Sequence, residues 1–225
     1  MGTNDFTFEC WVKPTVITSG NNNILAQWGS GNAFIFKYIA AGRLRFEGGG
    51  GVSGVSGTTT AVTVNQWNHV AITRSSSTVR LFVNGVMDAT SATIGALTEG
   101  ASVVAIGAYV DGSGEFVTGY ISNLRLLNGT ALYTTTFTPP TAPLTAISNT
   151  ALLTCQSNRL IDNSTNNATI TRYGDTNVQR FSPFSPSAAY STSTIGGSGY
   201  FDGNADYLSV PTNTALDLGT GDYTI

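Results

Sequence analysis

Acidic side chains in two glycine-rich loops are the residues best suited to chemistry in this sequence. One loop, Asp202-Gly-Asn204-Ala-Asp206, offers two carboxylates and an amide, and the other, Asp111-Gly-Ser-Gly-Glu115, offers two carboxylates. Hard cations such as Ca²⁺ prefer oxygen ligands of these kinds, so both loops are candidate calcium sites. Neither loop has the longer ligand series of an EF-hand. The alternative is that Asp111 and Asp202 form Asx turns and accept hydrogen bonds from their own backbone.

A tryptophan beside a polar loop suggests a second kind of chemistry. Trp28 precedes Gly29-Ser-Gly-Asn32, a position that favours an exposed ring. An exposed ring can stack on a sugar, and loop amides and carboxylates can bind its hydroxyl groups. We therefore predict Trp28, Asn32, Asp111 and Glu115 as ligand-binding residues, with ordinary packing of Trp28 as the alternative.

Catalytic groups are not apparent in the sequence. His69, the single histidine, lies among apolar residues, and no nucleophile or carboxylate nearby in the sequence makes it a catalytic base. We therefore predict a structural role for His69. Asp202 and Asp206 are spaced to share one face of a straight strand, as a glycosidase pair would require. However, Gly203-Asn204 between them predicts a turn instead. We predict no catalytic residues and no enzyme activity.

The charge content narrows the possible partners. Only 10% of the 225 residues are charged, against about 25% in an average soluble domain, and the net charge is −3. A nucleic-acid binder needs a dense basic face, so nucleic acid is excluded as a partner. The start of the chain lacks the features of a signal peptide, and no apolar run approaches the roughly 20 residues of a membrane span. A surface of Ser, Thr, Asn and Gly is common in secreted and virion proteins, which predicts an extracellular or virion location without membrane contact.

The two cysteines, Cys10 and Cys155, are too few for a disulfide framework or a zinc site. Cys10 lies in an alternating strand pattern. We interpret both as small buried apolar residues, with a disulfide as the alternative.

Short strand patterns separated by Gly, Asn, Ser and Pro run through the chain, and helical periodicity is almost absent. The turn Asn84-Gly85 indicates a tight hairpin, and Pro14 is expected to end the first strand. Residues 48–57 read as a loop or an irregular edge. This pattern predicts an antiparallel all-β sandwich or barrel. The expected strands in the first part cover residues 6–13, 23–28, 33–38, 43–47, 67–74, 78–83, 86–89, 103–108 and 118–127.

The composition changes after Leu132. Residues 137–149 contain three prolines and are expected to form a Pro/Thr linker, because proline cannot donate to a strand ladder. The expected organisation is therefore a first segment, 1–136, the linker, and a second segment, 150–225. Further strands are expected at 151–156, 168–172, 199–201, 207–210 and 223–225, with a polar loop at 181–194.

The two ends of the sequence nearly repeat each other. Gly2-Thr-Asn-Asp-Phe-Thr-Phe8 matches Gly219-Thr-Gly-Asp-Tyr-Thr-Ile225 at an offset of 217 residues. The match indicates one period of a tandem array, with a boundary that falls inside a strand.

Several strand motifs carry a resemblance to a known family. The stretches 6–14, 66–74, 79–85, 119–126 and 200–210 resemble strands of laminin-G-like, concanavalin-A-like lectin domains. Residues 152–190 resemble modules found in tandem in bacteriophage tail fibres. The resemblance implies a jelly-roll-like β-sandwich that recognises carbohydrate, and it favours calcium near the acidic loops. It also implies that Trp11 and Trp67, which belong to these strand motifs, lie in the core.

The order of the motifs departs from that family. There the strand containing Phe-Asp-Gly precedes the strand containing Glu-Cys-Trp, whereas here Phe201 follows Cys10. Residues 1–136 then resemble the later two-thirds of a domain, and residues 150–225 resemble the first third. Either the chain closes on itself as a circular permutant, or the second segment completes a neighbouring chain.

Three functions follow from these observations. The favoured one is a non-catalytic recognition module of a phage tail fibre or surface adhesin, which binds a cell-surface glycan or polysaccharide. The second is a structural repeat that links head to tail by strand exchange to build a fibre. A polysaccharide-degrading enzyme is least favoured, because it rests on fold analogy alone.

Overall fold

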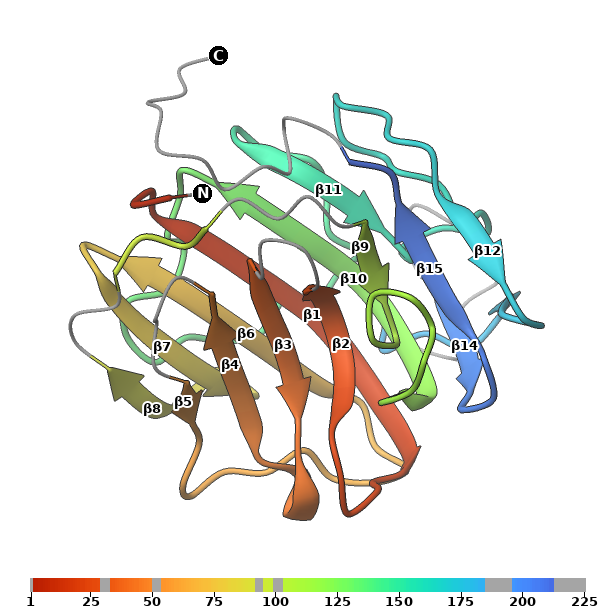
Figure 1. Cartoon of the computed structure of the whole chain (residues 1–225), viewed down its shortest axis with the longest axis horizontal. Coiled ribbons are helices and arrows are strands. Elements are labelled where there is room, and N and C mark those ends of the chain that lie inside the picture. The colour runs from red at the N-terminus through yellow and green to blue at the C-terminus, as the bar shows by residue number, and fades with distance from the viewer. Residues whose placement is uncertain are drawn as a thin grey trace.

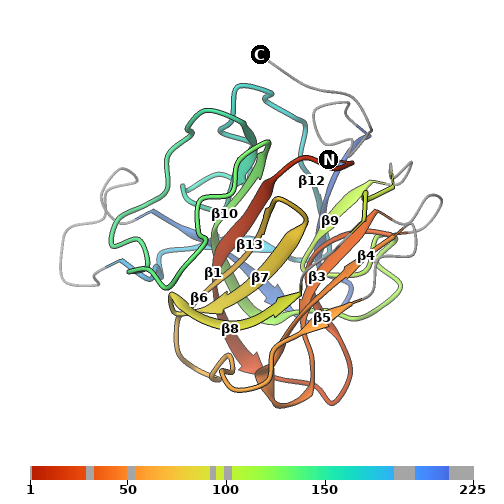
Figure 2. The same ribbon diagram turned by 90° about the vertical axis from the view of Figure 1, so that its left-hand side faces the viewer.

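Two antiparallel β-sheets pack face to face in the computed structural model, which describes residues 2–28, 33–49, 54–91, 95–98, 103–184 and 196–212. Within these ranges one sheet has the order β13-β14-β10-β1-β6-β7-β8, with β11 also paired to β10, and the other has the order β12-β15-β9-β2-β3-β4-β5. Figure 1 looks onto the second sheet, and Figure 2 shows the two layers from the side. The expected β-sandwich is confirmed.

The strands are short except for two long central ones. Their bounds are β1 Phe6–Val16, β2 Asn22–Gln27, β3 Phe34–Tyr38, β4 Leu44–Gly48, β5 Val55–Ser56, β6 Asn68–Ser75, β7 Thr78–Val83, β8 Val86–Ser91, β9 Val104–Ile106, β10 Thr118–Asn128, β11 Thr150–Thr154, β12 Thr171–Tyr173, β13 Asn177–Gln179, β14 Ser198–Asp202 and β15 Tyr207–Val210. One 3-10 turn, η1, spans Ala40–Gly42.

Aromatic rings from both sheets meet in the core. Phe6 and Phe8 of β1 are almost fully buried, and their centroids lie 4.9 Å apart. Phe8 approaches Phe34 of β3 at 4.8 Å, and Phe6 approaches Phe46 of β4 at 5.7 Å. Alternation along each strand directs these rings inward, so the period-2 pattern of the sequence places the core. Cys10 and Cys155 are buried as free thiols, as expected.

The first strand continues past Pro14, where the sequence predicted its end. Pairing of β1 with β6 stops at Val12, whereas pairing with β10 continues to Val16. At Pro14 the strand has no second neighbour, so the N–H that proline lacks leaves no hydrogen bond of the sheet unmade. The Pro14 carbonyl accepts a hydrogen bond from Asn65 N at 2.7 Å. A proline is tolerated where a strand has one partner only.

Strands from the second segment lie in the same two sheets as those from the first. β11 and β14 both pair with β10, and β15 pairs with β9. Phe201 and Leu208 are fully buried in the common core. The described part of residues 150–225 thus completes both layers beside residues 1–128, whereas the domain partition predicted from the sequence stays a prediction.

The segment that follows β10 covers the outer side of the first sheet. Figure 2 shows this green stretch, residues 129–149, passing beside β1 and β10 on the side away from the other sheet. Tyr133 and Phe137 stack with centroids 3.6 Å apart, and both rings contact Phe82 of β7. The proline-rich stretch expected as a linker thus packs on the sheet at Phe137, and Leu144 within it is also buried.

Several details differ from the sequence predictions. Trp11 and Trp67, expected in the core, are half-buried on the outer side of the first sheet, beside Phe184 and Phe181 respectively. The strand β13 was not predicted. Residues 55–56 form the edge strand β5, consistent with an irregular edge. The loop at 29–32 with Asn32, most of the loop at 181–194 and the strand at 223–225 lie outside the described residues.

Candidate functional site

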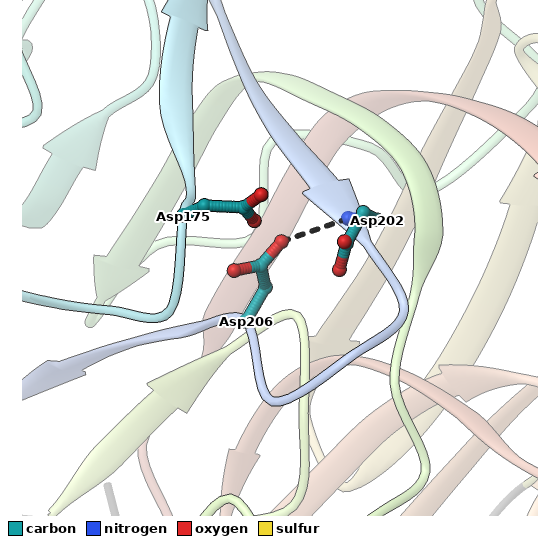
Figure 3. Close-up of side chains that lie close together, drawn as sticks. All are labelled: Asp175, Asp202 and Asp206. Carbon is teal, nitrogen blue, oxygen red and sulfur yellow. Dashed lines mark hydrogen bonds between the residues drawn. The ribbon is translucent and has the colours of Figure 1, made fainter.

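Three carboxylates meet where two turns that each lead from one sheet to the other come together. Asp175 lies in the turn between β12 and β13, while Asp202 and Asp206 flank the turn between β14 and β15. Each of the three offers an oxygen, and these oxygens lie within 4.8 Å of one another (Figure 3). Asp206 is buried, Asp202 is half-buried and Asp175 is exposed. The predicted pair Asp202 and Asp206 is thus brought together with a third acid from a distant part of the sequence.

Asp206 holds the two turns together through backbone hydrogen bonds. Its Oδ1 accepts a bond from Thr176 N at 3.0 Å, and its Oδ2 accepts one from Asp202 N at 2.8 Å. Asp202 in turn accepts a bond from Asn204 N at 2.7 Å, which makes an Asx turn. Asn204 enters this arrangement through its backbone and is exposed. A buried carboxylate occupied by two N–H donors is poorly suited to proton transfer.

The loop between β9 and β10 is tied to itself and to the sheet. Asp111 Oδ1 accepts a bond from Ser113 N at 2.9 Å, again an Asx turn, and hydrogen bonds from Ser113 lower the pKa of Asp111. Glu115 accepts bonds from the side-chain amides of Asn21 at 2.5 Å and Asn23 at 2.7 Å. The two carboxylates predicted as a calcium pair therefore have different partners, and Glu115 anchors the loop to β2.

This loop packs over the outer face of the second sheet. Tyr109, Val110 and the half-buried Trp28 form a small apolar cluster on Ala26 and Ile35. In Figure 1 the loop is the yellow-green turn between β2 and β15, next to the end of β9. The structure thus brings the predicted Trp28 to the same loop as the predicted Asp111.

Two tyrosines extend this face toward the sheet edge. Tyr173 of β12 and Tyr207 of β15 are cross-strand partners, and their rings stack at 4.0 Å with an interplanar angle of 5°. Tyr173 is 39% exposed. The ring of Tyr207 lies against Gly112, where an added Cβ would be 2.4 Å from Cε1. We call Trp28, Tyr109, Asp111, Tyr173 and Tyr207 the loop face.

His69 belongs to a buried polar network. Its Nε2 lies 3.2 Å from Oε2 of Glu9, and both side chains are fully buried. The other carboxylate oxygen of Glu9 accepts two bonds from Arg125, and Tyr133 donates to Oε2 at 2.8 Å. The structural role predicted for His69 agrees with this geometry.

The tyrosine pair and Asp175 were not predicted from the sequence. Tyr173 and Asp175 lie more than 25 positions before the residues that they contact, so no local spacing predicts these contacts. A usable signal was the motif Tyr-Gly-Asp at 173–175, in which a turn glycine places an aromatic ring and an acid side by side.

Residues 1–134 match the concanavalin A-like lectin/glucanases superfamily through its laminin-G-type family. That match covers more than half of the chain, so the chain belongs to this family. A search of curated proteins found no match.

Solved structures share the fold at low sequence identity. A candidate carbohydrate-binding protein from Bacteroides ovatus matches over 98% of this chain and 57% of its own, with 18% identity and a TM-score of 0.54. A Ruminococcus gnavus sialidase module, CBM40, matches over 59% of this chain and 80% of its own, with 15% identity and a TM-score of 0.43. Mouse laminin α1 domains LG4–5 match over 61% and 41%, with 17% identity and a TM-score of 0.43. The first of these likenesses supports the fold alone.

Among the residues that the structure describes, no helix has the length and apolar character needed to cross a membrane.

Proposed function

We propose that this chain is a non-catalytic carbohydrate-recognition module whose ligand binds the loop face. The observation that carries the proposal is the exposed Tyr173–Tyr207 stack beside Asp111 on a loop held by internal hydrogen bonds. Aromatic rings offer flat apolar surface to the C–H face of a sugar, and a carboxylate accepts bonds from its hydroxyl groups. The candidate Bacteroides ovatus carbohydrate-binding protein has the same fold, which is consistent with this function.

A glycan array followed by titration calorimetry tests the proposal. We expect the chain to bind at least one glycan class, and Tyr173→Ala to weaken binding about tenfold or more, since a well-placed ring is worth at least about 1.4 kcal/mol. The matched control is Phe181→Ala, because Phe181 is similarly exposed (38%) but packs on Trp67 of the other sheet. Absence of binding on a broad array with Ca²⁺ present, or equal losses in both variants, would contradict the proposed site.

Calcium at the acidic cluster is the second part of this proposal. Asp175 and Asp202 each present a carboxylate, and Asp206 completes a set of three oxygen donors from two turns. Ca²⁺ takes six to eight oxygens, so water, backbone carbonyls or ligand hydroxyls would supply the rest. Bound there, the ion would fix the two turns beside Tyr173 and Tyr207. The same proposal for Asp111 and Glu115 requires Glu115 to release its two asparagine partners.

The biological setting that we propose is a phage tail fibre or a surface adhesin, outside the cell or on a virion. Its support is the weakly charged composition and the near-repeat of the two ends of the sequence.

A second candidate function is structural: the chain is a repeat unit that joins head to tail to build a fibre. The near-repeat at an offset of 217 residues favours it. Light scattering over a concentration series tests this function. It predicts oligomers that grow with concentration, whereas a monomer at every concentration would contradict it.

A further inference from the structure

The beginning of β1 occupies a slot at the centre of the eight-stranded sheet. Phe6 is opposite Asn128 of β10 on one side and Arg74 of β6 on the other. A second copy of this stretch cannot add to a free edge in the same register, because both neighbours are already paired. It can enter only where residues 2–8 are absent or displaced.

We propose that residues 219–225 are a second copy of this strand start and fill the same slot in another unit of this fold. The inference rests on the second proposed function, and it names the partner and the contact. Of the four residues that are identical in the copy, Gly2, Asp5 and Thr7 make the hydrogen bonds that the slot requires, and Thr3 is exposed.

The glycine at the start is retained as Gly219. Gly2 has a positive φ of 46°, a conformation that suits glycine. Its carbonyl accepts bonds from Arg74 Nη1 at 2.6 Å and from Leu97 N at 2.9 Å. A side chain at this position would strain the turn that brings the carbonyl to both donors.

The two polar residues that bind neighbouring segments are also retained. Asp5 Oδ1 accepts a bond from Ser76 N at 2.9 Å, and its counterpart is Asp222. Thr7 Oγ1 donates to Thr130 O at 2.8 Å and accepts from Leu132 N at 2.9 Å. Its counterpart is Thr224, so the copy keeps the group that fastens the segment after β10.

The apolar positions keep their character. Phe6 and Phe8 fill the core, and their counterparts are Tyr223 and Ile225. The position that differs most, Asn4 against Gly221, is one whose side chain makes none of the bonds described above. The hydroxyl of Tyr223 is the one group in the copy without a counterpart in Phe6.

The occupant is therefore this fold's own strand sequence, and the host is a second unit of the fold. That unit can belong to a separate chain or lie further along the same polypeptide. In both cases the copy would make the same contacts between β6 and β10, and the experiment below distinguishes the two.

Disulfide trapping in the full chain tests the inference. Thr7 and Thr73 are opposite each other, and opposed antiparallel residues have Cα atoms about 4.5–5.5 Å apart, within the range that a disulfide spans. If Thr224 takes the place of Thr7, the double variant Thr73→Cys, Thr224→Cys refolded at high concentration forms a 73–224 disulfide between chains. The cross-linked fraction should increase with protein concentration.

Two matched variants calibrate the trap. Thr73→Cys with Thr7→Cys should form its disulfide within one chain, which shows that the slot geometry permits the bond. Thr73→Cys with Thr220→Cys should not cross-link, since Thr220 corresponds to Thr3, outside the strand. Cys10 and Cys155 are buried and should not react.

A two-unit polypeptide provides the second arm. Residues 1–225 followed by residues 9–225 keep the 217-residue period, with Thr224→Cys in the first unit and Thr73→Cys in the second. A 73–224 disulfide in this chain alone assigns the copy to a following unit, and one between separate chains assigns it to strand exchange. If the 7–73 disulfide forms and the 73–224 disulfide forms in neither arm, the inference is overturned. Oligomers without that disulfide would leave the structural function standing and remove this contact from it.

Discussion

At the scale of single residues, Glu9 is a fully buried charge with three side-chain partners, His69, Arg125 and Tyr133. Burial by itself raises the pKa of Glu9, but the hydrogen bond from His69 and the charge of Arg125 outweigh it and hold that pKa below its ordinary value of 4.5. The carboxylate joins β1, β6, β10 and Tyr133 of the covering segment. Its ionised form is thus required by four parts of the fold at once.

We predict that Glu9→Gln lowers the free energy of unfolding by about 3–5 kcal/mol, because Arg125 is left buried without its counter-charge. Chemical denaturation at neutral pH measures the change. The control is Asp111→Asn, because Asp111 is exposed and asparagine keeps the oxygen that accepts the hydrogen bond from Ser113 N. Its expected loss is about 0–0.5 kcal/mol, and equal losses in the two variants would refute the role given to Glu9.

The same carboxylate predicts a pH dependence. A folded-state pKa below the unfolded value contributes stability that is complete above about 4.5 and is lost as pH falls through the folded pKa. Thermal melts between pH 7 and pH 2 should therefore show a steeper acid loss in the native chain than in Glu9→Gln. If Tm falls equally with pH in the native chain and in Glu9→Gln, acidic groups other than Glu9 dominate the loss of stability between pH 7 and pH 2.

Gly112 sets how closely the loop approaches Tyr207. It has a φ of +68°, and an added Cβ would overlap the Tyr207 ring. We predict that Gly112→Ala costs about 1–3 kcal/mol and weakens glycan binding, since the ring must move from its stack with Tyr173. Gly20→Ala is the control, because Gly20 has open space around it. Unchanged stability and binding in Gly112→Ala would show that the loop does not position the ring.

At the scale of elements, alternation and turn chemistry predicted most strands. Residues 78–83 and 207–210 were placed with correct bounds, and both residues of the turn Asn84-Gly85 have the positive φ that such a hairpin needs. Pro14 misled the prediction, because whether a proline ends a strand depends on how many neighbours the strand has. That number is a tertiary property which the local sequence does not carry.

The candidate site was less predictable, for a related reason. Asp202 and Asp206 could be found together because one turn holds both. Asp175 and the Tyr173–Tyr207 stack depend on pairing between β12 and β15, whose residues are more than 30 positions apart. Trp11 and Trp67 were placed wrongly in the core. Both lie on the outer side of the first sheet, where later segments of the chain cover them, and strand alternation does not show that this outer side is covered.

The two turns that share the acidic cluster should respond to calcium. Saturation at a hundred times Kd would add about 2.7 kcal/mol of stability and raise the Tm by about 5–10 °C. The double variant Asp175→Asn, Asp202→Asn should lose this shift, whereas its backbone contacts to Asp206 remain. Scanning calorimetry with and without CaCl₂ measures both, and an unshifted native Tm would dismiss the calcium proposal.

At the scale of the whole molecule, the matched family region is only part of the folding unit. The family match ends at residue 134, yet β10 has β11 and β14 as partners from beyond it, and β9 has β15. Residues after 150 also place apolar side chains in the core, among them Leu152, Phe201, Leu208 and Val210. The recognition face shares this dependence, since Tyr173 and Tyr207 come from the second segment and their loop neighbours come from the first.

Residues 1–149 alone are therefore expected not to fold. Each large apolar side chain lost from the core removes about 1.5–3 kcal/mol, and the losses together rival the about 5–15 kcal/mol that stabilises a typical domain. Scanning calorimetry should show no cooperative transition for 1–149, and equimolar residues 150–225 should restore one. The control is the full chain cut at a protease site placed between the exposed residues Thr141 and Ala142, which should keep its transition. A fragment 1–149 that melts at the Tm of the full chain would mean that the second segment is an addition to a domain already complete, and the loop face would then have to be sought on the first segment alone.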